Sequence, residues 1–145
     1  MAVLTIIKEV KKIHPKEVAL VKIGDFFHAY GKDSYIMADL FGYKLKQIEQ
    51  NCSTCGFPSK SLPKVQAKLE NKKINYIILD RRNNYDLEHF QNFKNLNTYD
   101  ENFETAKKNI NLKRRIDAIH SKLTQNMNNP NIKITIQQIE QILTP

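Results

Sequence analysis

Long hydrophobic runs are missing from this chain. The longest apolar stretches, such as YIIL at 76–79, are far shorter than the roughly 20 residues that span a bilayer. The first twelve residues, MAVLTIIKEVKK, lack the basic-then-apolar order and the small-residue cleavage site of a signal peptide. We therefore expect a cytoplasmic protein, in which the hydrophobic 41% of residues forms a core.

Cysteine is also scarce, because only Cys52 and Cys55 occur, in a C-x-x-C spacing. A structural zinc site needs about four ligands. The histidines that could complete one are scattered singly, at His14, His28, His89 and His120. The pair also does not open a helix after a strand, as thioredoxin-type dithiols do. We interpret both residues as ordinary cysteines on a strand, and we predict no metal site and no cofactor.

Signatures of catalysis are absent as well. No G-x-x-x-x-G-K-[ST] phosphate-binding loop occurs anywhere in the sequence. No Ser/His/Asp set and no pair of carboxylates suggests another reaction. We therefore expect a binding protein that is not an enzyme and that does not hydrolyse ATP.

Basic residues are abundant by contrast. The formal net charge is +8 and the isoelectric point is about 9.5. Such a charge attracts polyanions, with nucleic acid as the first candidate and an anionic membrane as the second. The chain is also rich in Asn, Lys and Ile, which an AT-rich genome favours. The charge therefore supports a polyanionic partner without establishing one.

Predicted helices and strands alternate over the first 82 residues. Apolar spacing and turn residues predict helices at 3–13, 32–41 and 61–69, and strands at 17–23, 26–30, 43–48, 52–58 and 75–80. Gly24-Asp25 is a turn signal, Gly42 ends a helix, and Ser59 or Ser61 can cap the next one. This order predicts an α/β fold, in which a mixed and partly parallel sheet is flanked by helices.

The character of the chain changes after residue 82. We expect a first domain at 1–82 and a helical C-terminal extension at 83–145, with a short helix at 86–93 and a last helix capped by Thr135. Between them, apolar residues at steps of three and four predict a long amphipathic helix over 103–127. Its basic face is a solvated surface, a track for phosphates, or the outside of a dimer. Its apolar stripe docks onto the α/β domain or onto another chain.

Three segments between Lys22 and Asp80 follow one another in a distinctive order. They are GDFFHAYGKDS at 24–34, CGFP at 55–58, and a helix at 61–70 followed by NYIILD at 75–80. With the leading helix that ends at His14-Pro15, they resemble the N-terminal mismatch-recognition domain of the MutS family over about residues 2–82. No clamp or ATPase domain follows them, so we expect a stand-alone recognition domain.

The resemblance implies a role for Phe26. In the family, the first Phe of the G-D-F motif wedges into the minor groove and stacks on a mispaired base. An inserted ring exchanges base stacking for ring stacking and kinks the duplex, which a mismatch makes easier. Phe27 would face the core instead, because side chains alternate along a strand.

One residue departs from the family pattern. His28 stands where the family commonly has a Glu that hydrogen-bonds the wedged base. An imidazole can donate or accept but carries no fixed negative charge, so repulsion from nearby phosphates is removed. We predict firmer general binding and poorer mismatch discrimination than the family pattern gives.

Four lysines complete the predicted nucleic-acid-binding site, because they could contact phosphates beside the wedge: Lys22, Lys32, Lys44 and Lys46. We therefore predict non-enzymatic recognition of distorted duplex or structured nucleic acid, with DNA favoured over RNA. The alternative is a protein-interaction module that has lost DNA recognition and docks, onto a partner or as a homodimer, through helix 103–127.

Overall fold

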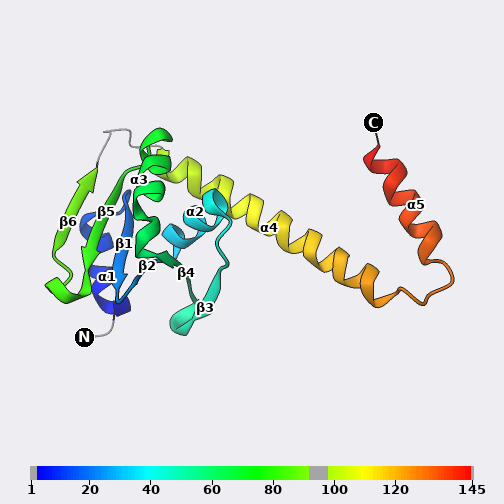
Figure 1. The fold of residues 1–145 in the computed structure, drawn as a ribbon, viewed down its shortest axis with the longest axis horizontal. Coiled ribbons are helices and arrows are strands. Elements are labelled where there is room, and N and C mark those ends of the chain that lie inside the picture. Colours follow the sequence, from blue (N-terminus) through cyan, green and yellow to red (C-terminus); the bar gives the residue numbers. More distant parts are fainter. Residues whose placement is uncertain (1–2, 92–97, 145) are drawn as a thin grey trace. The chain divides into compact units, whose positions relative to one another are not determined.

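A mixed β-sheet is the framework of this computed structural model, which describes residues 3–91 and 98–144 (Figure 1). Six strands form the sheet within these ranges: β1 Val18–Ile23, β2 Phe26–Tyr30, β3 Lys46–Ile48, β4 Cys52–Pro58, β5 Tyr76–Asp80 and β6 Leu87–Gln91. They lie in the order β3-β4-β2-β1-β5-β6. The β1–β5 pair is parallel and the other neighbouring pairs are antiparallel. The predicted α/β fold with a mixed sheet is confirmed.

The helices are α1 Val3–Ile13, α2 Lys32–Phe41, α3 Leu62–Asn71, α4 Thr98–Gln125 and α5 Ile132–Leu143. Single 3-10 turns occur at Glu49–Asn51, Ser59–Ser61 and Arg81–Asn83. Gly42 follows α2 in the left-handed conformation and donates its N–H to Ala38, which is the predicted helix end. No helix within the described ranges combines the length and the apolarity needed to cross a bilayer.

The two faces of the sheet are covered unequally. Side chains from α2, α3 and the first turns of α4 fill one face, where the main core contains Phe27, Phe57 and Tyr76. On the other face, α1 packs over β1 and β5 through a small cluster of Ile7, Val21 and Leu79. The strands β2, β4 and β3 continue this second face beyond α1. We call their outward positions the open face, which consists of Phe26, His28, Tyr30, Lys46, Ile48, Cys52, Thr54, Gly56 and Pro58.

A two-residue turn joins β1 to β2 and sets this register. Ile23 pairs with Phe26, which leaves Gly24 and Asp25 as the two loop residues. Gly24 has a φ of 63°, the left-handed value that two-residue hairpin turns with Gly in first place require. Because the loop length fixes the register, it also decides which side chains of β2 point away from the core.

Two predicted elements in the α/β part are wrong. Leu87–Gln91 is strand β6 and not part of a helix, because its backbone pairs with the edge of β5 despite an Asn- and Asp-rich neighbourhood. Residues 92 and 93 of that predicted helix lie outside the described residues. The strand predicted at 43–48 begins only at Lys46, because Tyr43 and Leu45 pack against the main core.

The predicted helix caps also differ from the structure. The side chain of Ser61 makes no cap hydrogen bond, and α3 continues from the 3-10 turn Ser59–Ser61. Thr135 lies inside α5, where its hydroxyl donates to the carbonyl of Asn131 at 3.1 Å. The long helix begins at Thr98, five residues earlier than predicted, because Tyr99 joins the main core.

The chain divides into two compact units, Met1–Asn109 and Ile110–Pro145. The predicted boundary lay at 82/83, whereas the first unit also contains β6 and the buried Tyr99 and Ala106 of α4. The second unit contains the rest of α4 and α5. None of its described residues is buried, so its helices have no core of their own.

Candidate nucleic-acid interface

Phe26 and Phe27 lie on opposite sides of β2. The Phe26 side chain is 49% exposed, whereas Phe27 is 3% exposed and stacks on Phe57 with ring centroids 5.5 Å apart. The exposed position comes directly after the Gly24-Asp25 turn. The strand therefore exposes the large apolar ring of Phe26 to solvent at the tip of the hairpin. The next residue, Phe27, is packed in the core.

Phe26 begins a row of three rings along the open face. Its ring centroid lies 6.5 Å from that of His28, with the planes inclined at 38°. His28 in turn lies 6.3 Å from Tyr30, with the planes inclined at 31°. The three residues occupy alternate positions of β2, so the regular spacing follows from the strand itself.

Gly56 of β4 makes room for the central ring of this row. It pairs with His28 across the two strands. A Cβ atom at position 56 would lie 3.0 Å from His28 Nδ1 and 3.0 Å from the carbonyl oxygen of Phe27. The imidazole therefore rests against the β4 backbone, at a distance that only glycine allows without displacement.

The environment of His28 favours its neutral form. Burial lowers the pKa of the imidazole below its usual 6.5, and the positive charge of Lys46 lowers it further. Lys46 shares the open face because it pairs with Thr54, which pairs with Tyr30. At pH 7 the centre of the row is an uncharged ring beside a lysine.

The structure does not bring all the predicted lysines together. Lys46 lies near His28, but Lys22 pairs with Phe27 and therefore points to the opposite face of the sheet. The Lys32 ammonium lies over the Phe103 ring, 5.1 Å from its centroid, at the start of α2. Lys44 is exposed in the connection that precedes β3.

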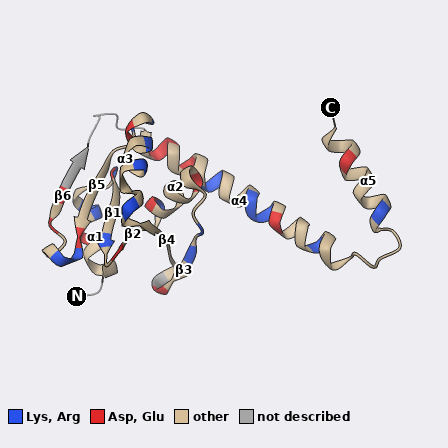
Figure 2. Cartoon of the chain, viewed as in Figure 1, with Lys and Arg blue, Asp and Glu red and all other residues tan. Residues whose placement is uncertain are grey.

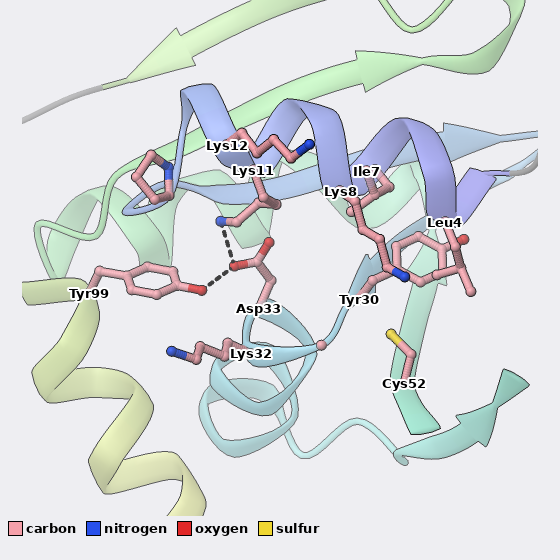
Figure 3. A pocket seen from close by; sticks show the side chains of 12 residues that line it. Leu4, Ile7, Lys8, Lys11, Lys12, Tyr30, Lys32, Asp33, Cys52 and Tyr99 are labelled. Carbon is pink, nitrogen blue, oxygen red and sulfur yellow. Dashed lines mark hydrogen bonds and ion pairs between the residues drawn. The ribbon is translucent and has the colours of Figure 1, made fainter. Parts of the chain in front are cut away.

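A cavity of about 530 Å³ opens where the row ends at Tyr30 (Figure 3). Four lysines line it, namely Lys8, Lys11, Lys12 and Lys32, together with the buried carboxylate of Asp33. This carboxylate accepts hydrogen bonds from Lys11 Nζ at 3.0 Å, from the Tyr99 hydroxyl at 2.5 Å and from the Ala19 N–H at 3.1 Å. Asp33 therefore ties α1, α2, α4 and β1 together beside a hollow lined by four lysine side chains.

The two cysteines point away from each other. Cys55 lies in the main core, and burial raises the pKa of its thiol to about 12. Cys52 is half-buried and lines the cavity on the other side of β4. Within the described ranges, no group of three or more His, Cys, Asp or Glu side chains could hold a metal ion.

Comparison with known proteins bears on the family of the chain. The family model described as MutS domain I matches residues 2–129, which is most of the chain. The chain belongs to the MutS domain I family. It is also similar to the DNA mismatch repair protein MutS of Parabacteroides distasonis, with 31% identity over 65 residues. This match covers 42% of the chain but only 8% of the relative's length.

The sequence predicted Phe26 and His28 as site residues, and that assignment stays a prediction; the sequence did not single out three neighbouring features of the structure. Tyr30 is the third ring of the row, and Gly56 leaves space for the His28 ring at its centre. Asp33 hydrogen-bonds the elements around the adjacent cavity. The alternation of aromatic residues at 26, 28 and 30 is a signal that could have identified Tyr30. The role of Gly56 depends on the β2–β4 register, which the sequence does not show.

Proposed function

We propose that this protein binds distorted duplex or structured nucleic acid through its open face, without catalysis, and that DNA is the preferred form. The observation that carries the proposal is the 49% exposed Phe26 ring at a hairpin tip, on a strand whose Phe27 is anchored in the core. Membership of the MutS domain I family and the formal charge of +8 support it. A cytoplasmic location is part of the same proposal.

Phe26 acts as the wedge in this proposal. Its ring is already exposed, so insertion at a base step buries apolar area without unfolding the hairpin. A mismatch or bulge lowers the cost of unstacking and would be preferred for that reason. Lys46 contributes a phosphate contact from the same face, which positions the protein without reading sequence.

The test is fluorescence anisotropy with matched, mismatched and bulged DNA duplexes at two salt concentrations. We expect tighter binding to the mismatch or bulge, and we expect Phe26→Ala to remove that preference. Leu87→Ala is the matched control, because Leu87 is 43% exposed but lies on the edge strand β6. Equal binding of parent and Phe26→Ala to every duplex would contradict the wedge.

His28 tunes the same interaction. A neutral imidazole avoids the repulsion that a carboxylate would exert on phosphates, so the parent should bind matched duplex more firmly than His28→Glu. The variant should also show a larger ratio of mismatched to matched affinity. Matched-duplex binding by His28→Glu as tight as that of the parent would contradict this role.

A second candidate function is association with another copy of this chain through the unit Ile110–Pro145. Within the described residues, α4 carries the apolar side chains Leu112, Ile116, Ile119 and Leu123 at steps of four, three and four, the spacing of a coiled-coil seam. Ile116 is 60% exposed and Ile119 is 54% exposed. Two such helical hairpins could bury their stripes in a four-helix bundle.

Sedimentation velocity separates this candidate from nucleic-acid binding. We expect concentration-dependent dimers that Ile116→Lys abolishes and that the neighbouring Arg115→Ala leaves intact. Apolar association should also be nearly indifferent to salt, whereas duplex binding should weaken with a log–log slope of roughly −0.9 per phosphate contact. A parent chain that stays monomeric at every concentration would exclude self-association.

A further inference from the structure

Three rings in a row offer more stacking surface than a single wedge uses. We propose that unpaired nucleotides stack along Phe26, His28 and Tyr30, so that the open face binds a short extended single strand. The inference rests on the proposed function, because it assumes that this face binds nucleic acid. It adds a ligand class, namely two or three consecutive unpaired nucleotides.

The spacing of the rings favours an extended strand. Neighbouring centroids are 6.5 Å and 6.3 Å apart. Stacked bases in one strand of B-DNA follow one another every 3.4 Å, so each interval is about twice the duplex rise. One base per ring therefore requires a stretched, unpaired backbone. A base-paired duplex could engage only the ring at the end of the row.

The β4 residues beside the row have small side chains, which leaves room for bases on the rings. Gly56 has no side chain next to His28. Thr54 turns its hydroxyl back to the chain, where it donates to the carbonyl of Ala29 at 2.9 Å. Neither residue projects a long side chain across the row. Aromatic rings accept any base by stacking, so such a surface would show little sequence preference.

Positive charge is available along this path. Lys46 lies beside the central ring, and the cavity with four lysines adjoins Tyr30 (Figure 3). Lys11 is committed to Asp33, and the exposed Lys12 pairs with Glu9 at 2.8 Å. A phosphate could displace the exposed pair at little cost, because such pairs contribute about 0–1 kcal/mol. The neutral His28 ring adds stacking without charge.

Tyr30 differs from the other two rings because it also has a structural contact. It is half-buried and packs against the cluster of Ile7, Val21 and Leu79 under α1. Truncation to alanine could therefore disturb the fold. Tyr30→Leu keeps an apolar side chain in this contact and removes the aromatic face, which makes it the suitable variant.

The experiment measures affinity of the full chain for labelled oligo(dT) and for duplexes with bulges of one or three nucleotides. We expect the parent to bind oligo(dT) and the three-nucleotide bulge more tightly than the one-nucleotide bulge. His28→Leu and Tyr30→Leu should each weaken oligo(dT) binding roughly 5- to 150-fold, the range for loss of one base–aromatic stack. Both variants should weaken oligo(dT) binding more than they weaken binding to the one-nucleotide bulge, where Phe26 supplies the stack.

Three further measurements test specificity, stacking and folding. Tyr35→Leu changes a half-buried tyrosine of α2 that packs on Phe103, away from the row, and should leave every affinity unchanged. A 2-aminopurine in the centre of the oligonucleotide should lose fluorescence on binding the parent if it stacks. Variants that unfold are recognised by thermal melting.

The failures of the two proposals differ. Loss of all binding in Phe26→Ala, with unchanged oligo(dT) affinity in His28→Leu and Tyr30→Leu, would overturn the stacking row and leave the single wedge. Unchanged affinities in all three variants would overturn both, and would assign binding to another basic surface.

Discussion

Substitution of Phe27 should mainly lower the stability of the protein, whereas substitution of Phe26 should mainly weaken nucleic-acid binding. Phe27 is 3% exposed and stacks on Phe57, so Phe27→Ala removes a core ring and leaves a cavity. Such truncations cost about 3–5 kcal/mol, and the lost ring pair accounts for about 0.5–1.5 kcal/mol beyond its buried area. Domains are stable by about 5–15 kcal/mol in total. The variant should therefore approach the unfolding threshold.

Phe26→Ala should behave in the opposite way. Full burial of such a ring stabilises a protein by roughly 1.5–3 kcal/mol, and the Phe26 side chain is only about half buried, being 49% exposed. We therefore expect Phe26→Ala to lower the free energy of unfolding by about 1 kcal/mol. Loss of base stacking at Phe26 should instead weaken binding to a bulged duplex by about 1–3 kcal/mol. The two neighbouring substitutions should thus have separate effects.

Urea denaturation followed by tyrosine fluorescence is the suitable stability assay. The chain has no tryptophan, and all of its tyrosines lie in the unit Met1–Asn109: Tyr30, Tyr35, Tyr43, Tyr76, Tyr85 and Tyr99. The signal therefore reports on the α/β unit and not on the helices after Asn109. A Phe26→Ala chain destabilised as much as Phe27→Ala would refute the assignment of the two rings to opposite faces.

Three further perturbations test the surroundings of the row. Gly56→Ala should displace the His28 imidazole, shift its NMR ring resonances and lower stability by about 1–3 kcal/mol, because the added Cβ would lie 3.0 Å from the ring and from a backbone oxygen. Asp33→Ala should lower stability by about 3–5 kcal/mol in the same urea assay, because it removes both the ion-pair partner of Lys11 and the acceptor of the buried Tyr99 hydroxyl. Asp33→Asn should cost less. Burial lowers the pKa of His28 in the folded chain, so the unfolded chain takes up a proton first as the pH falls below about 6.5. The free energy of unfolding should therefore decrease as the pH falls below that value. His28→Leu should remove the share of this decrease that His28 causes.

The sequence predicted the framework of the fold because its signals there are local. The Gly24-Asp25 turn, the alternation through Phe26 and Phe27, and Gly42 after α2 each depend on a few neighbouring residues. Each of these features is confirmed by the structure. The exposed position of Phe26 could therefore be predicted from the sequence.

The errors arose where distant contacts decide the structure. Leu87–Gln91 is a strand because β5 offers an unpaired edge, which no pattern within the segment reveals. The long helix begins at Thr98 because Tyr99 reaches Asp33, 66 residues earlier in the chain. In the same way, Lys22 and Lys46 look equivalent in sequence, but the strand register places them on opposite faces of the sheet.

The basic helix α4 is the surface that competes with the open face for nucleic acid. Lys and Arg recur along it, as Figure 2 shows, and they include Lys107, Lys108, Lys113, Arg114 and Arg115. Charge alone would bind any polyanion there, with strong salt dependence and no preference for distorted duplex. Locating the bound nucleic acid on the protein therefore separates the two surfaces directly.

An NMR titration of the ¹⁵N-labelled chain with a bulged DNA duplex makes that measurement. We expect the amide resonances of β2, β4 and Lys46 to shift on binding, and we expect the shifts in β2 to disappear in Phe26→Ala. Shifts confined to α4, with Phe26 and its neighbours unchanged, would contradict the claim that the open face recognises nucleic acid.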